Sequence, residues 1–405
     1  MKPVVEFVDV MYAYPNGPLS LQGISLSVEK GKKIALVGPN GAGKTTLLLM
    51  CNGILSPSSG TVRINGNDLL YDNKSLRDVR KKVGFVFQNS DNQIFAPTVY
   101  QDVAFGPLNL GMGNDEIRDV VTKTLFSVGL CGYEKRPPHH LSGGEKKRVA
   151  IAGLLAMEPD VLVFDEPTSS LDPASAAEIM DLLDELNDKG TTILVSTHDV
   201  ELAYSWADEV ILIAEGSILH HGAPESVFTD QALMKKARLT LPPVLELYME
   251  LVARGILEEN KPPEGILEMV GQVERAFGKA RGSSRPGRIY LCNPDSVDVE
   301  LLKKSLIGGT IRHVGAMGTR AKMFAEKEGI VLTFTYGVID KCILKAYLGE
   351  DTLIITTGGM LSRVTERVGR CAGESRVRIP VLSFGDEKIV PYSPATSGRM
   401  NFLNL

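Results

Sequence analysis

A glycine-rich loop between two apolar segments is the feature that most restricts how this chain can fold. The loop reads Gly38-Pro-Asn-Gly-Ala-Gly-Lys-Thr45 and fits the pattern G-x-x-x-x-G-K-[ST]. It follows the apolar run 33–38, which is typical of a buried strand, and leads into the leucine-rich run 45–52, which is typical of a buried helix. This order predicts an α/β domain that carries the loop at the end of a sheet.

The residue types of this loop suit a bound phosphate group. Glycines let backbone N–H groups approach phosphate oxygens, and the start of the following helix adds the positive end of a dipole. Lys44 is predicted to reach the β- and γ-phosphates of a nucleotide, and the Thr45 hydroxyl to hold Mg²⁺. The predicted nucleotide contacts are Gly38, Pro39, Asn40, Gly41, Ala42, Gly43, Lys44, Thr45 and Thr46.

Strands and helices alternate along the first 240 residues. The predicted strands are 4–10, 21–28, 33–38, 60–65, 82–88, 160–164, 191–196 and 209–213. The predicted helices are 45–52, several within 98–155, 173–189 and 200–206, and residues 225–255 are helical in composition except at Pro242-Pro243. This alternation predicts a mostly parallel sheet that is covered on both faces.

Two further motifs carry chemistry. Asp165 and Glu166 end an apolar strand about 120 residues after the loop; Asp165 suits the Mg²⁺ shell and Glu166 suits the orientation or deprotonation of an attacking water. Ser142 is a candidate N-cap, and Gly143 and Gly144 expose the amides of the helix that follows. The second motif indicates either another anion site or an ordinary capped helix.

Taken in order, these motifs resemble the nucleotide-binding domain of ATP-binding cassette (ABC) ATPases over about residues 4–240. The resemblance implies a P-loop NTPase fold of the α/β class, with a mostly parallel core sheet, an antiparallel subdomain and a helical subdomain. It implies a catalytic set of Lys44, Gln88, Glu166 and His198, and Mg²⁺ ligands at Thr45, Gln88 and Asp165. It also implies that Tyr14, with Tyr12 as its rival, stacks on adenine. Glu145 and Ser170 depart from the commoner Gln and Ala of the family.

In this family two domains face each other head to tail, and ATP lies between them. The resemblance therefore implies that one subunit's glycine-rich loop meets the partner's Ser142, Gly143 and Gly144, with Asp172 in the loop that crosses the interface. The chain has one set of motifs, so we expect a homodimer or a heterodimer with a paralogous ATPase. ATP and Mg²⁺ are the expected cofactors.

The segment 86–111 resembles the coupling region of energy-coupling-factor transporter ATPases, especially the cobalt/nickel group. The resemblance implies a transmembrane coupling subunit and a substrate-binding membrane subunit as partners, and a peripheral position at the cytoplasmic face of the cell membrane. Gln93, Ile94, Phe95 and Pro97 are predicted to form the groove for a membrane-protein helix. The alternative is a buried helix–loop segment. Co²⁺ or Ni²⁺ is the expected substrate, and a vitamin is the alternative.

Composition excludes several other classes of protein. The net charge of −5 is too small to indicate a nucleic-acid partner, and no apolar run approaches the roughly 18 residues that cross a bilayer. The five cysteines lack CxxC spacing, which argues against a zinc module or a disulfide framework and favours a reducing cytosol. The remaining alternatives are a soluble cassette ATPase in DNA repair or translation, and a non-catalytic binding module.

The last part of the chain differs in character. Residues 281–405 carry 18 Lys and Arg against 12 Asp and Glu, and 278–287 has the composition of a linker. We predict three parts: an ATP-binding cassette at 1–240, a helical segment and linker at 241–287, and a small α/β domain at 288–405. The predicted elements of the last part are strands 288–292, 329–335 and 352–357 and helices 297–306 and 320–327. Its expected role is dimer contact or regulation.

Four short features of the chain stay open. The turns at 315–318 and 357–360 are glycine-rich, so each is either an anion site or a plain turn. His313 stands with few other metal ligands, so a metal-sensing site in the tail has a poor ligand set. His220 and His221 are adjacent, which in a strand places them on opposite faces, so a surface hairpin is favoured over a metal site.

Overall fold

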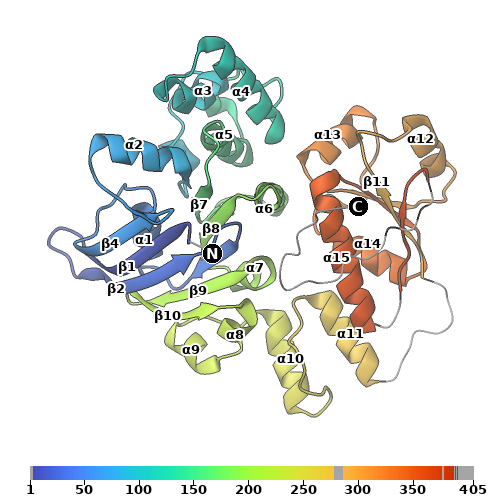
Figure 1. Cartoon of the computed structure of the whole chain (residues 1–405). Coiled ribbons are helices and arrows are strands. Elements are labelled where there is room, and N and C mark those ends of the chain that lie inside the picture. Colours follow the sequence, from blue (N-terminus) through green and yellow to red (C-terminus); the bar gives the residue numbers. More distant parts are fainter. Residues whose placement is uncertain (1–2, 278–285, 376–377, 387, 389, 391–405) are drawn as a thin grey trace, which may run out of the picture. The chain divides into compact units, whose positions relative to one another are not determined.

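The chain folds into two compact units, residues 1–246 and 247–405, in the computed structural model (Figure 1). The structure describes residues 3–277, 286–375, 378–386, 388 and 390. The linker predicted at 278–287 therefore lies mostly outside the described residues. Since each unit has its own hydrophobic core, the two are described separately.

The first unit is built on a six-stranded sheet with the order β10-β9-β3-β8-β7-β6. All neighbours in it run parallel except the hairpin β9–β10. Its strands are β3 (Lys33–Val37), β6 (Val83–Val86), β7 (Val161–Asp165), β8 (Thr192–Thr197), β9 (Glu209–Ala214) and β10 (Ser217–Gly222). Successive residues of β7 pack on opposite faces, with Val163 in one core cluster and Phe164 in the other. The mostly parallel, two-faced sheet predicted from the sequence is confirmed.

A second, antiparallel sheet covers one face of the first. Its order is β2-β1-β4-β5, with β1 (Val5–Ala13), β2 (Leu19–Val28), β4 (Ser59–Ile64) and β5 (Asn67–Asp68). Alternate residues of β2, such as Ile24 and Leu26, are buried, because one face of this sheet packs inward and the other meets solvent. Helix α1 (Lys44–Met50) shares that core, with Leu47 and Leu48 fully buried.

Helices form the rest of the first unit, and α3, α4 and α5 gather in a bundle at one end of it (Figure 1). The bundle helices are α3 (Val99–Asn109), α4 (Asn114–Ser127) and α5 (Gly143–Leu155), with the 3-10 turns η1 (Ser90–Asn92) and η2 (Pro138–His140) beside them. The remaining helices are α2 (Asn73–Lys82), α6 (Pro173–Asp188), α7 (Val200–Trp206), α8 (Pro224–Phe228), α9 (Gln231–Lys236) and α10 (Pro243–Ala253). The antiparallel and helical subdomains implied by the family resemblance are present.

The second unit is a four-stranded parallel sheet with the order β12-β13-β11-β14. Its strands are β11 (Ile289–Cys292), β12 (His313–Ala316), β13 (Thr352–Ile355) and β14 (Val381–Ser383). Its helices are α11 (Ile266–Ala276), α12 (Val299–Ile307), α13 (Thr319–Lys327), α14 (Val338–Tyr347) and α15 (Gly358–Ser375). Side chains of α11, α14 and α15 share a core with one face of the sheet, and those of α12 and α13 with the other.

The small α/β domain is thus present, but several of its predicted elements are wrong. Residues 329–335 do not form a strand, because their pairing is limited to one bridge between Phe334 and Gly315 and to bonds from Thr333 and Phe334 to Val314. The strand in this region is β12 instead, and β14 and helices α14 and α15 were not predicted. The contact grouping also puts α11 with the second unit, where Glu268 of α11 pairs with Arg367 of α15.

Candidate nucleotide site

The glycine-rich loop joins β3 to α1 at the carboxyl edge of the core sheet. A Cβ atom at Gly38 would lie 2.1 Å from the carbonyl oxygen of Ile213 in β9, so no other residue fits there without movement. Gly43 has a φ of 101°, in the left-handed region that favours glycine. The loop therefore needs its glycines both for close packing on the sheet and for the turn into the helix.

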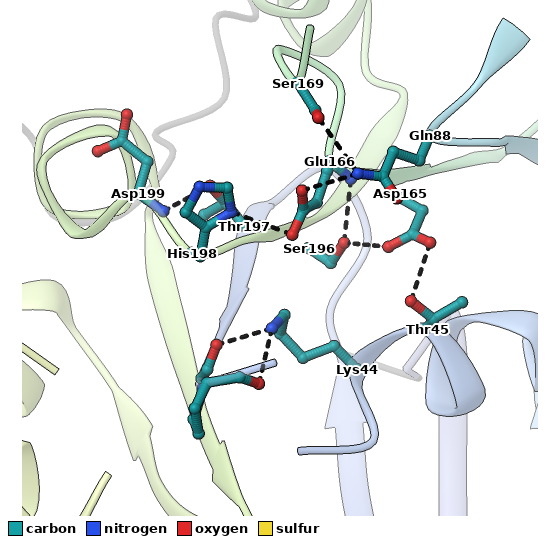
Figure 2. A network of polar contacts seen from close by, with 12 residues as sticks. Lys44, Thr45, Gln88, Asp165, Glu166, Ser169, Ser196, Thr197, His198 and Asp199 are labelled. Carbon is teal, nitrogen blue, oxygen red and sulfur yellow. Dashed lines mark hydrogen bonds and ion pairs between the residues drawn. The ribbon is translucent and has the colours of Figure 1, made fainter. Parts of the chain in front are cut away.

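Lys44 is buried and holds the loop together in the absence of a ligand. Its Nζ donates to the carbonyl oxygens of Gly38 at 2.7 Å and Pro39 at 3.1 Å (Figure 2). Burial lowers the pKa of Lys44, and the negative charges of Glu166 and Asp165 act against that shift. The same ammonium group can exchange carbonyl partners for the oxygens of a bound anion.

Asp165 ends β7 and has a hydroxyl partner on each carboxylate oxygen. Thr45 Oγ1 donates to its Oδ2 at 2.9 Å, and Ser196 Oγ donates to its Oδ1 at 2.5 Å. Ser196 lies opposite Asp165 in the parallel register of β7 and β8. Sequence reasoning missed Ser196, although its place two residues before His198 on a strand end could have indicated it.

Glu166 joins the two polar residues that the sequence motif analysis placed around it. Gln88 Nε2 donates to Glu166 Oε2 at 3.1 Å and to Ser169 Oγ at 3.2 Å, while His198 Nδ1 lies 3.1 Å from Glu166 Oε1 (Figure 2). The Glu166 N–H donates to Ser196 Oγ, and its φ of 45° is unusual for a residue with a side chain. A strained, doubly bonded carboxylate at a strand end indicates a functional site.

These groups surround a cavity of about 620 Å³. It is lined by Tyr14, Gly17, Pro18, Leu19, Ser20, Asn40, Gly41, Gly43, Lys44, Thr45, Thr46, Gln88, Asp165, Glu166 and His198. Tyr14 lines it, with its hydroxyl 3.1 Å from Thr46 Oγ1, whereas Tyr12 does not and packs edge-on against the Tyr14 ring. Gly38, Pro39 and Ala42 lie behind the loop, where Ala42 is buried.

The Ser142–Gly144 segment lies outside this cavity. Ser142 is the N-cap of α5 and forms a capping box with Glu145: each residue's backbone N–H donates to the other's side chain. Asp172 likewise caps α6 by accepting from the backbone of Ala174 and Ser175. The structure therefore brings the glycine-rich loop, Gln88, Asp165, Glu166 and His198 together, and it does not bring Ser142–Gly144 or Asp172 to them.

Lys147 of α5 links this capped helix to Gln88. Its side chain is 2% exposed, and Nζ donates to the carbonyl oxygens of Phe87 at 3.0 Å and Gln88 at 2.7 Å. Burial lowers the pKa of Lys147 to about 8. A lysine in a Glu-Lys-Lys-Arg run gives no sequence signal of such burial, so its role was not predicted.

An exposed apolar patch lies next to Gln88 in the sequence. It consists of Phe95, Phe105 and Leu108, which are 64%, 47% and 58% exposed, and the two phenyl rings are 4.7 Å apart. The predicted groove residues are only partly confirmed. Ile94 packs against the core, and the Gln93 side chain bonds the backbone of Phe85 and Phe87, so neither presents a free surface.

Other candidate features resolve simply. The residues His220 and His221 lie in the predicted hairpin and have different partners, Ser226 and Glu209. Within the described residues, no group of three or more His, Cys, Asp or Glu side chains could hold a metal ion. Every helix in that part of the chain is too short or too polar to cross a bilayer.

Comparison with known proteins agrees with this geometry. The ABC transporter family model matches residues 21–169. A solved structure described as cbiO1 from Clostridium perfringens, part of the ABC transporter complex cbiONQ, is 40% identical with a TM-score of 0.54 and covers 62% of this chain and 100% of that one. The fold, the glycine-rich loop and the paired carboxylates thus define an ATP-binding cassette ATPase.

Curated relatives narrow the class. The energy-coupling factor transporter ATP-binding protein EcfA2 of Methanospirillum hungatei is 51% identical over 96% of this chain and 98% of its own length. EcfA of Methanocaldococcus jannaschii is 55% identical over 67% of this chain and 96% of its own length. The chain belongs to the family of energy-coupling factor transporter ATP-binding proteins, which are ATP-hydrolysing transport enzymes.

Proposed function

We propose that this chain energises a metal-ion importer by hydrolysing ATP between two cassette subunits. The observation that carries the proposal is the bonded set of Gln88, Glu166 and His198 at the mouth of the glycine-rich loop. This set joins a carboxylate that can accept a proton to the loop that can hold phosphates. The residue roles below follow from that arrangement.

The phosphates of ATP lie along the glycine-rich loop, with Lys44 on the β- and γ-phosphates. Gly38, Pro39, Asn40, Gly41, Ala42, Gly43, Thr45 and Thr46 complete the loop, and Tyr14 stacks on adenine. Thr45, Gln88 and Asp165 would hold Mg²⁺, because the 2.9 Å contact between Thr45 and Asp165 brings together the hard oxygen donors that this ion prefers. When bound, Mg²⁺ neutralises charge on the phosphate oxygens.

Glu166 acts as the base that orients and deprotonates the attacking water. Gln88 and His198 hold its two carboxylate oxygens in the unliganded chain, and each can turn to the water or to the γ-phosphate when nucleotide is present. Lys44 stabilises the charge that develops on the transferred group. Ser196 positions both carboxylates, since its hydroxyl contacts Asp165 and the Glu166 backbone.

The functional enzyme is a head-to-tail dimer, either of this chain or with a paralogue. Support comes from the exposed helix start at Ser142, Gly143 and Gly144, which lies outside the cavity of its own subunit and suits the phosphates of a partner's ATP. Asp172 caps α6 in the loop that meets the partner. A cassette that is 31% identical, with a TM-score of 0.50, is described as dimeric in a post-hydrolysis state with ADP and phosphate.

The membrane partners are a transmembrane coupling subunit and a substrate-binding subunit, and the chain sits peripherally on the cytoplasmic face of the membrane. The exposed patch of Phe95, Phe105 and Leu108 offers an apolar surface for a helix of the coupling subunit. The resemblance of segment 86–111 to the cobalt/nickel group supports Co²⁺ or Ni²⁺ as the transported ion. A vitamin is the second candidate, and it uses the same subunit arrangement.

Glu166→Gln tests the catalytic assignment. We expect ATP turnover to fall roughly 100-fold or more, because the general base is lost, while ATP binding persists. Size-exclusion chromatography with ATP should then show a stable dimer. Glu201→Gln, at an exposed position on α7, is the matched control and should behave as the wild type. Normal turnover by Glu166→Gln would refute the role of Glu166.

Purification of the tagged chain from native membranes in mild detergent tests the assembly. We expect two integral membrane proteins to copurify, and uptake of labelled Co²⁺ or Ni²⁺ to depend on Glu166. Uptake of a vitamin in place of either ion would identify the second candidate. Copurification of ribosomal or DNA-bound proteins alone would contradict the transporter assignment while leaving the ATPase chemistry intact.

The second unit serves dimer contact or regulation in this proposal. A relative with 96% of its length aligned to this chain matches only 67% of it, so the ATP-binding function does not require all of the chain. Deletion of 285–405 should change transport or dimerisation. Unchanged values for both would remove this role.

A further inference from the structure

Two glycine-bearing turns of the second unit, far apart in the sequence, lie side by side at one edge of its sheet. The turn 315–318 follows β12, and the turn 357–360 follows β13, its parallel neighbour. The Met317 N–H donates to the carbonyl oxygen of Ile355 at 2.9 Å, which ties the two turns together. In a parallel sheet this carboxyl edge is where the helices begin and where ligands bind.

The edge includes the point where the direction of the chain reverses. After β13 the chain enters α15 on one face of the sheet, whereas after β11 it enters α12 on the other face. The Thr356 N–H donates to the carbonyl oxygen of Cys292 at 2.9 Å, so β13 and β11 are still adjacent where they diverge. Open α/β sheets bind their ligands at such a point.

The helix starts at this edge lack negative charge. Gly318 precedes α13 without a side-chain cap, and neither α13 nor the 18-residue α15 has an acidic residue in its first turn. The first N–H groups of a helix have no partner within the helix, and the helix dipole adds positive charge to them. Arg320, in the first turn of α13, places a cation at the same edge.

A buried hydroxyl without a partner points to a ligand here. Thr356 is 0% exposed, and its Oγ1 has no hydrogen-bond partner among the described residues. Ile355 packs on the α12 and α13 side, so the alternation of the strand directs Thr356 toward the side covered by α15, which begins two residues later. Buried hydroxyl groups are normally bonded, so this one indicates a partner that the protein itself does not supply.

Gly358 adds a second indication. A Cβ atom there would meet nothing within 4 Å, and its φ lies outside the left-handed region. Neither packing nor backbone conformation therefore requires glycine at the first position of α15. A glycine that the fold does not need is explained by close approach of a ligand to the backbone.

We propose that this edge, formed by Gly318, Thr356 and Gly358, binds a small molecule through a phosphate group. Two helix starts and one hydroxyl supply donors from several directions, which suits the three or more oxygens of a phosphate better than the two of a carboxylate. The site is separate from the ATP cavity and does not depend on the proposed transport function. It gives the second unit a ligand to sense.

Inorganic phosphate is the probe for the first experiment. The full chain is prepared with Lys44→Ala, which weakens phosphate binding at the glycine-rich loop, and with ¹⁵N-glycine, and its amide spectrum is followed during titration. Gly318→Ala and Gly358→Ala identify the two resonances. We expect both resonances to shift and saturate. Absence of a saturable shift at either would overturn the proposal, and tighter saturation by acetate would overturn the phosphate class.

Thr356→Val tests the hydroxyl with a readout that a structural role would not give. We expect the apparent phosphate affinity to fall roughly tenfold, while the unfolding temperature without phosphate is unchanged or raised, because a hydroxyl without a partner contributes nothing to the empty fold. Thr352→Val, at the opposite end of β13, is the control and should keep phosphate affinity. A lower unfolding temperature for Thr356→Val together with unchanged affinity would show that the hydroxyl serves the fold alone.

Discussion

The buried ammonium group of Lys147 donates a hydrogen bond to the backbone carbonyl of Gln88 at 2.7 Å. The side chain of the same Gln88 bonds Glu166 at 3.1 Å. A lysine of helix α5 therefore holds, through one residue, the carboxylate that ends β7. Because α5 begins at the Ser142 cap, this contact joins the helical bundle to the cavity of the glycine-rich loop.

Lys147→Met should lower kcat for ATP roughly tenfold with little change in KM. The substitution keeps the length of the side chain and removes the two donated bonds, so Gln88 loses its position while the phosphate loop is untouched. Steady-state ATPase assays check this. Lys146→Met is the control, because its partner Asp91 is exposed and lies outside the cavity. An equal effect of both variants would contradict a specific role for Lys147.

The stability of the chain should depend on the protonation of Lys147. Burial lowers its pKa in the folded state to about 8, below the ordinary value of 10.5, so between these values the unfolded chain binds more protons. Folding stability from this group therefore rises with pH across that window, by up to about 1.4 kcal/mol per pH unit. Denaturant unfolding of wild type and Lys147→Met at several pH values measures it. The wild type should gain relative to the variant as pH rises above about 8, and parallel curves would disprove the shift.

Gly38→Ala should abolish ATP binding and destabilise the first unit by about 1–3 kcal/mol, because its Cβ would press on the Ile213 carbonyl oxygen. Chemical denaturation and binding of a fluorescent ATP analogue provide the two readouts. Gly113→Ala is the matched control, since a Cβ there meets nothing within 4 Å and φ is −72°. A stable, ATP-binding Gly38→Ala would mean that the loop can move away from β9.

One cysteine should react with a maleimide in the folded chain. Cys131 is exposed, whereas the other four thiols are buried, and burial raises the pKa of Cys51, Cys292 and Cys342 to about 12. Mass spectrometry should show one label on the native chain and five after denaturation. Rapid labelling of Cys292 or Cys342 under native conditions would indicate that the second unit opens readily.

Much of the first unit could be predicted because its signals are local. The apolar runs at β3 and β7 and the loop at Gly38–Thr45 are contiguous, so hydrophobic periodicity and motif chemistry identify them without distant contacts. The second unit was harder for a physical reason. The run 329–335 has strand-like composition, but it forms a single bridge, at Phe334. The short β12, which contains Gly315, lies between more apolar strands that determine its pairing.

The sequence by itself determined which groups of this protein carry chemistry: the lysine, threonine, carboxylates and histidine stand in motifs whose chemistry follows from adjacent residues. Tertiary structure decided which of them meet. Ser196 reaches Asp165 because the parallel register of β7 and β8 sets them opposite each other. Lys147 is buried because α5 packs on the segment that contains Gln88. Such contacts join residues that are remote in the chain, and only the packing of the sheet and helices fixes them.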